Sequence, residues 1–241
     1  MRVLGLDSAT NVGSVALVEE GRLLAEVTFN IKKNHSERLM PMLAWMLEEA
    51  QLSLKDLDGF AVAAGPGSFT GLRIGLATMK ALAYVEQKPL LAISTLDGLA
   101  ANLGNQEGLI CPILNAGKNE VYTALYRWES DDLQRISEYL AISPEGLLSI
   151  LQKKQEQVTF LGDGVPIYGN FLQEKYPQAR FTAATNSLCR ASQIADLGLK
   201  KLQAGEIADT FTLEPIYIRA SEAEVNWKKK NPQPDGGSVG I

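Results

Sequence analysis

The residues of this chain that could do chemistry gather at two places, and the first is Asp7-Ser8-Ala9-Thr10. An aspartate at the end of an apolar run, followed by small hydroxyl residues, can hold a metal–phosphate group, because hydroxyls and backbone amides face the phosphate oxygens. The same residue types also form ordinary chain reversals. Taken alone, the motif favours an ordinary turn. Under the alternative of phosphate binding, Asp7, Ser8 and Thr10 are the candidate contacts.

The second place is the stretch from Gly65 to Gly75, GPGSFTGLRIG, between a predicted strand and a predicted helix. A helix that begins here would present backbone amides to an anion, with Gly67 and Ser68 as contacts. The stretch is not a Walker loop, because no Lys-Ser/Thr follows it, and its glycine spacing is not that of a dinucleotide site. The alternative is a capped helix in which Gly71 and Gly75 allow another helix to approach. We favour this close packing over phosphate binding.

The histidine count excludes several classes of enzyme. The chain has one histidine, His35. Zinc proteases, His-based catalytic triads and His-rich metal sites all need more than one. His35 stands near a predicted helix start, where a structural role is more common than that of a catalytic base. We therefore predict no metal site and no catalysis that depends on histidine.

Composition indicates a globular protein of ordinary character. The chain has 241 residues, 46% hydrophobic and 21% charged, and a net charge of −5. An acidic chain is a poor nucleic-acid binder by itself, because that affinity comes mostly from Lys and Arg on phosphates. Cys111 and Cys189 are expected to be reduced core residues. Without a signal peptide or a run of 18 apolar residues, the expected location is the cytoplasm and no membrane is involved.

Hydrophobic periodicity predicts an α/β chain of two similar lobes with a cleft between them. Each lobe begins with short strands joined by turns and continues with alternating helices and strands. The expected lobes are residues 1–104 and 105–220, and 221–241 form a polar, mobile tail. The first lobe is expected to hold strands 2–8, 13–18, 23–30, 59–64 and 89–93 and helices 36–51, 70–85 and 95–103. The second is expected to hold strands 109–115, 121–128, 135–141 and 157–162, a helix from Ser143, a helix ending near Tyr176 and a helix over 187–203.

Two helices of the first lobe are candidates for a protein interface. The helix over 36–51 is apolar over more than the single stripe that a surface helix needs, and it is rich in methionine. The helix over 70–85 is its expected neighbour, so the two could pair with the same two helices of another chain. The residues expected to make the contact are Leu39, Met42, Met46, Arg73, Ile74 and Ala77.

Several motifs of the chain, taken together, resemble the bacterial TsaB (YeaZ) family. The resemblance covers nearly the whole chain up to Arg219, and the glycine-rich stretch is its most specific part. It implies the fold of the actin/Hsp70/sugar-kinase superfamily, with a mixed five-stranded sheet flanked by helices in each lobe. The motifs are LGLDSAT (4–10), NHSERLMP (34–41), AAGPGSFTGLRIG (63–75), NEVY (119–122), GDG (162–164) and PIYIR (215–219).

The resemblance also implies a function in making N6-threonylcarbamoyladenosine beside the anticodon of tRNA. Family members are similar to the catalytic subunit TsaD and bind it, and the assembly recruits the ATPase TsaE. This chain lacks the pair of histidines, four residues apart, with which TsaD binds metal. The implied role is a non-catalytic scaffold, with tRNA as an indirect partner and no intrinsic cofactor, although ATP or ADP could lie at the complex interface. Alone, the chain would form a homodimer through the same surface.

Departures from the family pattern leave alternatives open. Asp7 matches the phosphate-contact aspartate of the superfamily, but Ala9 replaces a glycine usually found near it. Where family members often read Asp-Ala-Arg, this chain has Asn115-Ala116-Gly117-Lys118, so the role of that turn is open. The alternative function is a small autonomous ATPase or kinase. A metallopeptidase is disfavoured by the histidine count.

Overall fold

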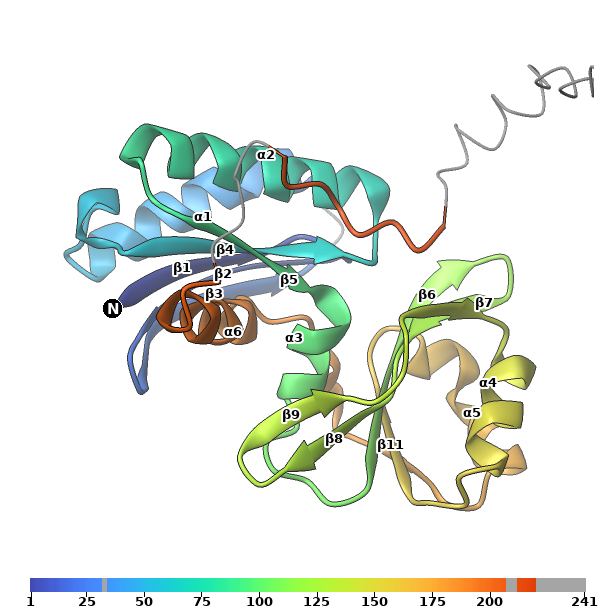
Figure 1. The fold of residues 1–241 in the computed structure, drawn as a ribbon. Helices are drawn as coiled ribbons and strands as arrows, with labels where there is room; N and C mark the ends of the chain where they lie inside the picture. Colours follow the sequence, from blue (N-terminus) through green and yellow to red (C-terminus); the bar gives the residue numbers. More distant parts are fainter. Residues whose placement is uncertain (32–33, 207–211, 220–241) are drawn as a thin grey trace, which may run out of the picture.

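The computed structural model describes residues 1–31, 34–206 and 212–219 and arranges them in two lobes (Figure 1). The expected tail, 221–241, lies outside these residues. No helix in the described part is long and apolar enough to cross a membrane. Cys111 and Cys189 are free and buried, as predicted.

The N-terminal lobe is built on a five-stranded sheet with helices on both faces (Figure 1). The strand order is β3-β2-β1-β4-β5, with the first three strands antiparallel and β1, β4 and β5 parallel. β4 is buried over its whole length, which explains its continuous apolar sequence. The strands are β1 (Arg2–Asp7), β2 (Val12–Glu19), β3 (Arg22–Asn30), β4 (Gly59–Gly65) and β5 (Leu90–Ser94). The helices of this region are α1 (His35–Glu49), the 3₁₀ helix η1 (Leu54–Asp56), α2 (Phe69–Glu86) and α3 (Thr95–Ala101).

The C-terminal lobe repeats the connectivity of the first. Its main sheet has the order β10-β7-β6-β11-β12. When the strands of each sheet are ranked by their place in the chain, this order is the same as that of the N-terminal sheet, with β6 in the place of β1. The prediction of two related lobes is therefore confirmed. The hairpin of β8 and β9 is an insertion into this plan. The elements are β6 (Leu109–Gly117), β7 (Glu120–Thr123), β8 (Tyr126–Glu129), β9 (Asp132–Arg135), β10 (Leu140–Ile142), α4 (Pro144–Gln152), β11 (Val158–Leu161), α5 (Val165–Lys175), β12 (Ala179–Phe181), the 3₁₀ helix η2 (Ala184–Ser187) and α6 (Ala191–Gln203).

Two expected strands of the C-terminal lobe differ from the structure. The single strand expected over 121–128 breaks into β7 and β8, which pair with different parts of β6 through Tyr122 to Leu114 and Tyr126 to Ile110. The strand expected over 135–141 is wrong, because residues 136–139 lie between β9 and β10. The inserted β8–β9 hairpin could not be recognised from the sequence, because strands of four residues are too short to show a clear alternation of apolar and polar residues.

Capping residues explain where the helices begin. The Ser68 side chain accepts a hydrogen bond from the Gly71 amide at the start of α2, and Ser143 does the same for Gly146 at the start of α4. Pro144 follows as the first residue of α4, a position at which proline lacks no hydrogen bond that the helix needs. Ser94 caps α3 by accepting a hydrogen bond from the Leu96 amide.

The last described helix, α6, and the described segment that follows it return to the N-terminal lobe. α6 packs on the sheet face opposite α1 and α2 (Figure 1). The two backbones are so close that a Cβ on Gly5 would lie 2.4 Å from the Ala191 carbonyl oxygen. Residues 213–219, called the strap below, follow: Leu213 joins the core of the N-terminal lobe, and the Ile216 amide donates to Ala64 O across 2.7 Å. The expected second lobe, 105–220, therefore does not contain its last two segments.

Candidate functional site

The turn after β1 lies at the centre of the cleft between the lobes. Thr10 and Asn11 line three neighbouring cavities of about 310, 340 and 340 Å³. The most polar of them, the cleft cavity, has walls from both lobes. Its lining residues are Ala9, Thr10, Asn11, Gly67 and Ser68 from the N-terminal lobe and Leu114, Asn115, Ala116, Gly117, Tyr122 and Asp163 from the C-terminal lobe.

The structure brings three of the five candidate phosphate contacts into the cleft cavity and leaves two outside. Thr10, Gly67 and Ser68 line it. Asp7 and Ser8 are each 1% exposed and lie beneath it. Asp7 Oδ1 accepts a hydrogen bond from the Ala9 amide at 2.9 Å, while burial raises the pKa of its carboxyl to about 6.

The glycine-rich stretch packs against the turn after β1. A Cβ on Gly67 would lie 2.3 Å from Ala9 O, and one on Gly71 would lie 2.0 Å from Ser8 O. The expectation of close packing is therefore confirmed, but the expected neighbour was wrong: it is the bend after β1 and not another helix. The Ser68 amide donates to Ala9 O across 2.6 Å. Packing thus uses an amide that a phosphate would need.

The C-terminal wall of the cleft cavity carries a carboxylate. Asp163, in the turn after β11, accepts a hydrogen bond from the Asn115 amide at 2.8 Å, and burial raises the pKa of its carboxyl. In the sequence this segment stood out only as the GDG motif (162–164) of the family resemblance. No lysine or arginine lines the cavity in the described part of the chain, so an anionic ligand finds little charge compensation there.

His35 has a structural contact, as expected. Its Nε2 lies 2.7 Å from Thr10 O. A carbonyl oxygen only accepts hydrogen bonds, so Nε2 carries the proton. The first turn of α1 thereby fixes the turn at the centre of the cleft.

The six expected interface residues divide between core and surface. Leu39, Met42 and Met46 are 2%, 6% and 1% exposed and belong to the core under α1. In this chain they are core residues and not exposed ones, because the wide apolar face of α1 splits into a core-facing part and an outer part. On α2, Arg73 and Ala77 are exposed and Ile74 is half-buried against the core.

The outer parts of α1 and α2 carry exposed apolar residues that the sequence-based assignment missed. On α1, Met40 and Trp45 are 46% and 54% exposed; on α2, Tyr84 and Val85 are 59% and 71% exposed. The two helices lie side by side on one face of the sheet (Figure 1). On α1 no signal in the sequence marked them, because Met40 and Trp45 are as apolar as the buried residues of the same helix. The exposed set, called the helix face below, is Met40, Ala44, Trp45, Ala77, Ala81, Tyr84 and Val85.

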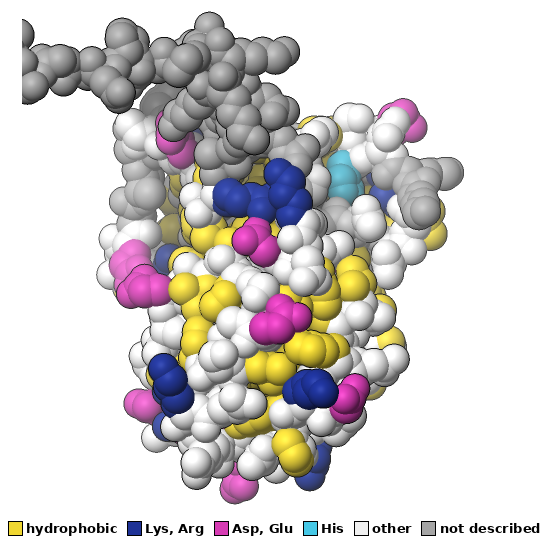
Figure 2. Space-filling model, turned by 90° about the vertical axis from the view of Figure 1, so that its right-hand side faces the viewer, with side chains coloured by type: hydrophobic (Ala, Val, Ile, Leu, Met, Phe, Trp, Pro, Cys, Tyr) yellow, Lys and Arg dark blue, Asp and Glu magenta, His cyan; other side chains and the backbone are white. Residues whose placement is uncertain are grey.

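The C-terminal lobe has an apolar area of its own. Figure 2 shows hydrophobic side chains across the middle of this lobe's outer face, with charged side chains scattered among them. α4 and α5 lie on that side of the molecule (Figure 1). Ile167 of α5 is 55% exposed, which makes it a useful comparison residue for the helix face.

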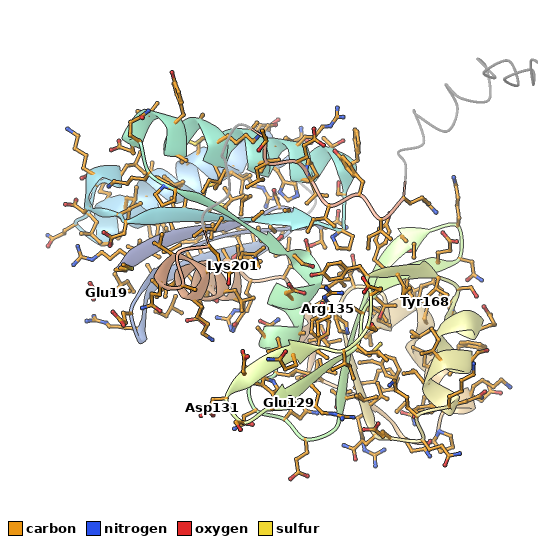
Figure 3. The ribbon with its side chains drawn as sticks, in the orientation of Figure 1. Glu19, Glu129, Asp131, Arg135, Tyr168 and Lys201 are labelled. Atoms are coloured by element: carbon orange, nitrogen blue, oxygen red, sulfur yellow. The ribbon has the colours of Figure 1, made fainter. Side chains whose placement is uncertain are left out.

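A polar cluster fixes the β8–β9 hairpin to α3. Asp97 accepts hydrogen bonds from the hydroxyls of Tyr126 at 2.7 Å and of Tyr139 at 2.8 Å. The Arg135 guanidinium lies over the Tyr139 ring, 4.2 Å from its centre. Figure 3 marks Arg135 where β9 ends, and Asp131 at the far tip of the hairpin. The cluster is fully occupied by these contacts, which is typical of a structural role.

Comparison with known proteins gives a consistent result. Residues 22–227 match the family model "TsaD: tRNA N6-adenosine threonylcarbamoyltransferase". The tRNA threonylcarbamoyladenosine biosynthesis protein TsaB of Bacillus subtilis is 35% identical over 94% of this chain and 98% of its own length. The chain belongs to the TsaB family.

Solved structures agree with this TsaB assignment. A Pseudomonas aeruginosa protein described as similar to the peptidase YeaZ has a TM-score of 0.76 and 28% identity, over 90% of this chain and 99% of its own. The ROK hexokinase of Thermus thermophilus matches with a TM-score of 0.51 and 14% identity, over 84% of this chain and 100% of its own. The second likeness concerns the fold alone, and it confirms the expected sugar-kinase-like architecture. As a TsaB family member, the chain has its function in threonylcarbamoyladenosine biosynthesis.

Proposed function

We propose that this chain is a non-catalytic scaffold that binds and activates a TsaD-like subunit in the complex that forms N6-threonylcarbamoyladenosine beside the anticodon of tRNA. The observation that carries the proposal is the helix face, where Trp45 is 54% and Val85 71% exposed. Large exposed apolar side chains gathered on two adjacent helices are typical of a protein–protein interface. Ala44, Ala77 and Ala81 between them allow the helices of a partner to approach closely.

The cleft supports a role without chemistry. Asp7, the residue that matches the superfamily's phosphate contact, is 1% exposed beneath the cavity. The described lining of the cavity offers no basic side chain to a nucleotide. His35 is bonded to Thr10 O, and the described residues hold no group of three potential metal ligands. These features favour a scaffold over the metallopeptidase and the autonomous ATPase.

Further partners follow from the same proposal. A TsaE-like ATPase would join through the complex, and ATP or ADP would lie at the complex interface if it binds. The free chain would form a homodimer through the helix face, since an isologous contact uses the same surface of both copies. The cytoplasm would be the place of action, with tRNA held mainly by the partner, because this chain carries a net charge of −5.

The test is co-expression with a TsaD-like subunit, followed by gel filtration and by measurement of the modified nucleoside. Trp45→Glu and Ala77→Glu should each separate the complex and reduce the nucleoside while leaving the circular dichroism unchanged. Ile167→Glu, a matched charge at an exposed apolar residue of the other lobe, should leave the complex intact. A complex that survives both helix-face changes would place the contact elsewhere.

The ATPase alternative has its own test. Titration calorimetry of the purified chain with ATP should give no measurable heat of binding in the absence of a partner. Tight binding that is lost in Asp7→Ala would instead favour the enzyme. Peptidase activity abolished by a chelator would favour the metallopeptidase.

A further inference from the structure

Arg73 lies in an aromatic clamp at the beginning of α2. Its guanidinium carbon is 3.9 Å from the centre of the Phe69 ring. Its Nε is 3.5 Å from the hydroxyl oxygen of Tyr217, and the rings of Phe69 and Tyr217 stack with centres 5.3 Å apart. A guanidinium stacked on an aromatic ring is attracted to it and loses less freedom when it later forms hydrogen bonds.

The clamp is formed before any partner binds, because the strap is fixed at both ends. On one side of Tyr217, the Ile216 amide donates to Ala64 O across 2.7 Å. Gly65 makes room for this contact, since a Cβ there would lie 2.8 Å from Ile216 O. On the other side, Arg219 pairs with Glu120 of the C-terminal lobe at 2.6 Å.

Arg73 differs from most arginines of the described chain in having no carboxylate beside it. Its contacts there are the two aromatic side chains, and it is exposed. The planar fork of its terminal nitrogens is thus left for a ligand. The arginines that do pair with a glutamate are Arg2, Arg127, Arg135, Arg190 and Arg219.

We propose that Arg73, held by Phe69 and Tyr217, binds a carboxylate of the TsaD-like partner and sets the register of docking on the helix face. This inference rests on the proposed function. Arg73, Ala77 and Ala81 are four residues apart on α2 and all exposed, so the charge lies at one end of an apolar stripe on the same helix face. A charge in that place rejects a misaligned partner more than it adds affinity.

A carboxylate is favoured over an RNA phosphate by what surrounds Arg73. Toward the C-terminal end of α2, the exposed residues on the side of Arg73, Ala77 and Ala81, are small and apolar and offer nothing to a polynucleotide backbone; the exposed polar neighbour, Thr70, carries no positive charge. The net charge of the chain is −5, which opposes RNA. The acidic group expected on the partner is therefore an aspartate or glutamate side chain next to an apolar helix surface.

The experiment measures the affinity of the purified TsaD-like subunit for wild type and variants at two salt concentrations. Arg73→Gln should weaken binding by about tenfold or more and flatten its salt dependence. Arg73→Lys keeps the charge but not the planar fork, so its loss should be intermediate. Tyr217→Ala should weaken binding with Arg73 present and have little effect in Arg73→Gln, since the two residues act as one unit. Arg22→Gln, at an exposed arginine on β3, is the control and should bind as wild type.

The outcomes separate the two proposals. If wild type binds and Arg73→Gln binds equally well with the same salt dependence, this inference fails and the scaffold function stands. If Arg73→Gln lowers the urea midpoint but not the affinity, the clamp is structural and the inference also fails. If Arg73→Gln weakens binding of tRNA and not binding of the TsaD-like subunit, the ligand of Arg73 is a phosphate, and the proposal of a partner carboxylate fails. If wild type does not bind the TsaD-like subunit, the proposed function and this inference fall together.

Discussion

The hydroxyl of Ser8 donates a hydrogen bond to the carbonyl oxygen of Gly71 across 2.9 Å. This bond joins the turn after β1 to the first turn of α2, and Gly75 continues the contact because a Cβ there would lie 2.3 Å from Ser8 Oγ. The most specific motif of the sequence is therefore a packing device. It positions α2, which carries half of the helix face.

Gly71→Ala should destabilise the protein by about 2 kcal/mol, because the added Cβ would lie 2.0 Å from Ser8 O and a backbone atom cannot yield easily. The gain in helix propensity from alanine offsets only part of this cost. Urea unfolding measures the change. Gly104→Ala is the control, since no atom lies within 4 Å of its added Cβ, and it should stay within about 0.5 kcal/mol of wild type.

Asp7→Asn should raise the free energy of unfolding at pH 7. Burial raises the pKa of Asp7 from 3.8 to about 6 in the folded chain. As the pH rises from about 4 to about 6, the unfolded chain releases this proton first, so the stability of the wild type falls over that window. The difference amounts to about 3 kcal/mol, which Asn would recover while still accepting from the Ala9 amide.

Urea unfolding of wild type and Asp7→Asn between pH 3.5 and 7 checks this. The two proteins should differ little at pH 3.5, where the aspartate is protonated in both states, and diverge up to about pH 6. A variant less stable than wild type at pH 7 would contradict the assigned cause of the shift.

Glu26→Ala should cost about 3 kcal/mol of stability. This carboxylate, 10% exposed, pairs with Arg190 and accepts hydrogen bonds from the Ser192 amide at 3.1 Å and hydroxyl at 2.7 Å, which fixes the start of α6 on β3. Thermal unfolding measures the loss. Glu19→Ala breaks the pair with Arg2, whose side chains are 33% and 37% exposed, and should cost less than about 1 kcal/mol. If Glu26→Ala and Glu19→Ala lower stability by the same amount, the hydrogen bonds of Glu26 to Ser192 contribute no more to stability than an exposed ion pair does.

Met46→Ala should lower stability and Trp45→Ala should weaken association, although the two residues are adjacent on α1. Met46 is 1% exposed and Trp45 is 54% exposed. Met46→Ala should therefore lower stability by about 3 kcal/mol, as removal of a core side chain does. Trp45→Ala should leave the urea midpoint nearly unchanged and weaken association with a TsaD-like subunit by about tenfold or more. A destabilised Trp45→Ala would indicate that this tryptophan serves the fold instead.

The sequence by itself determined the family, the two-lobed α/β plan and the exclusion of histidine-based sites. Strands such as β4 and capped helices such as α2 and α4 depend on local pattern, and local pattern is readable from one chain. The glycine-rich stretch between β4 and α2 was also readable as a packing motif, because its four glycines are not followed by the lysine that a phosphate-binding loop needs.

Only the tertiary structure decided which face of α1 is exposed and where the strap returns. Leu39, Met42 and Met46 are as apolar as Met40 and Trp45, so hydrophobicity cannot tell core residues from exposed ones; the position of the sheet does. The clamp of Phe69, Arg73 and Tyr217 joins residues 144 positions apart, a separation at which no local pattern signals contact. Long-range packing set these arrangements, because removing apolar surface from water is favourable on whichever face of a helix the rest of the chain covers.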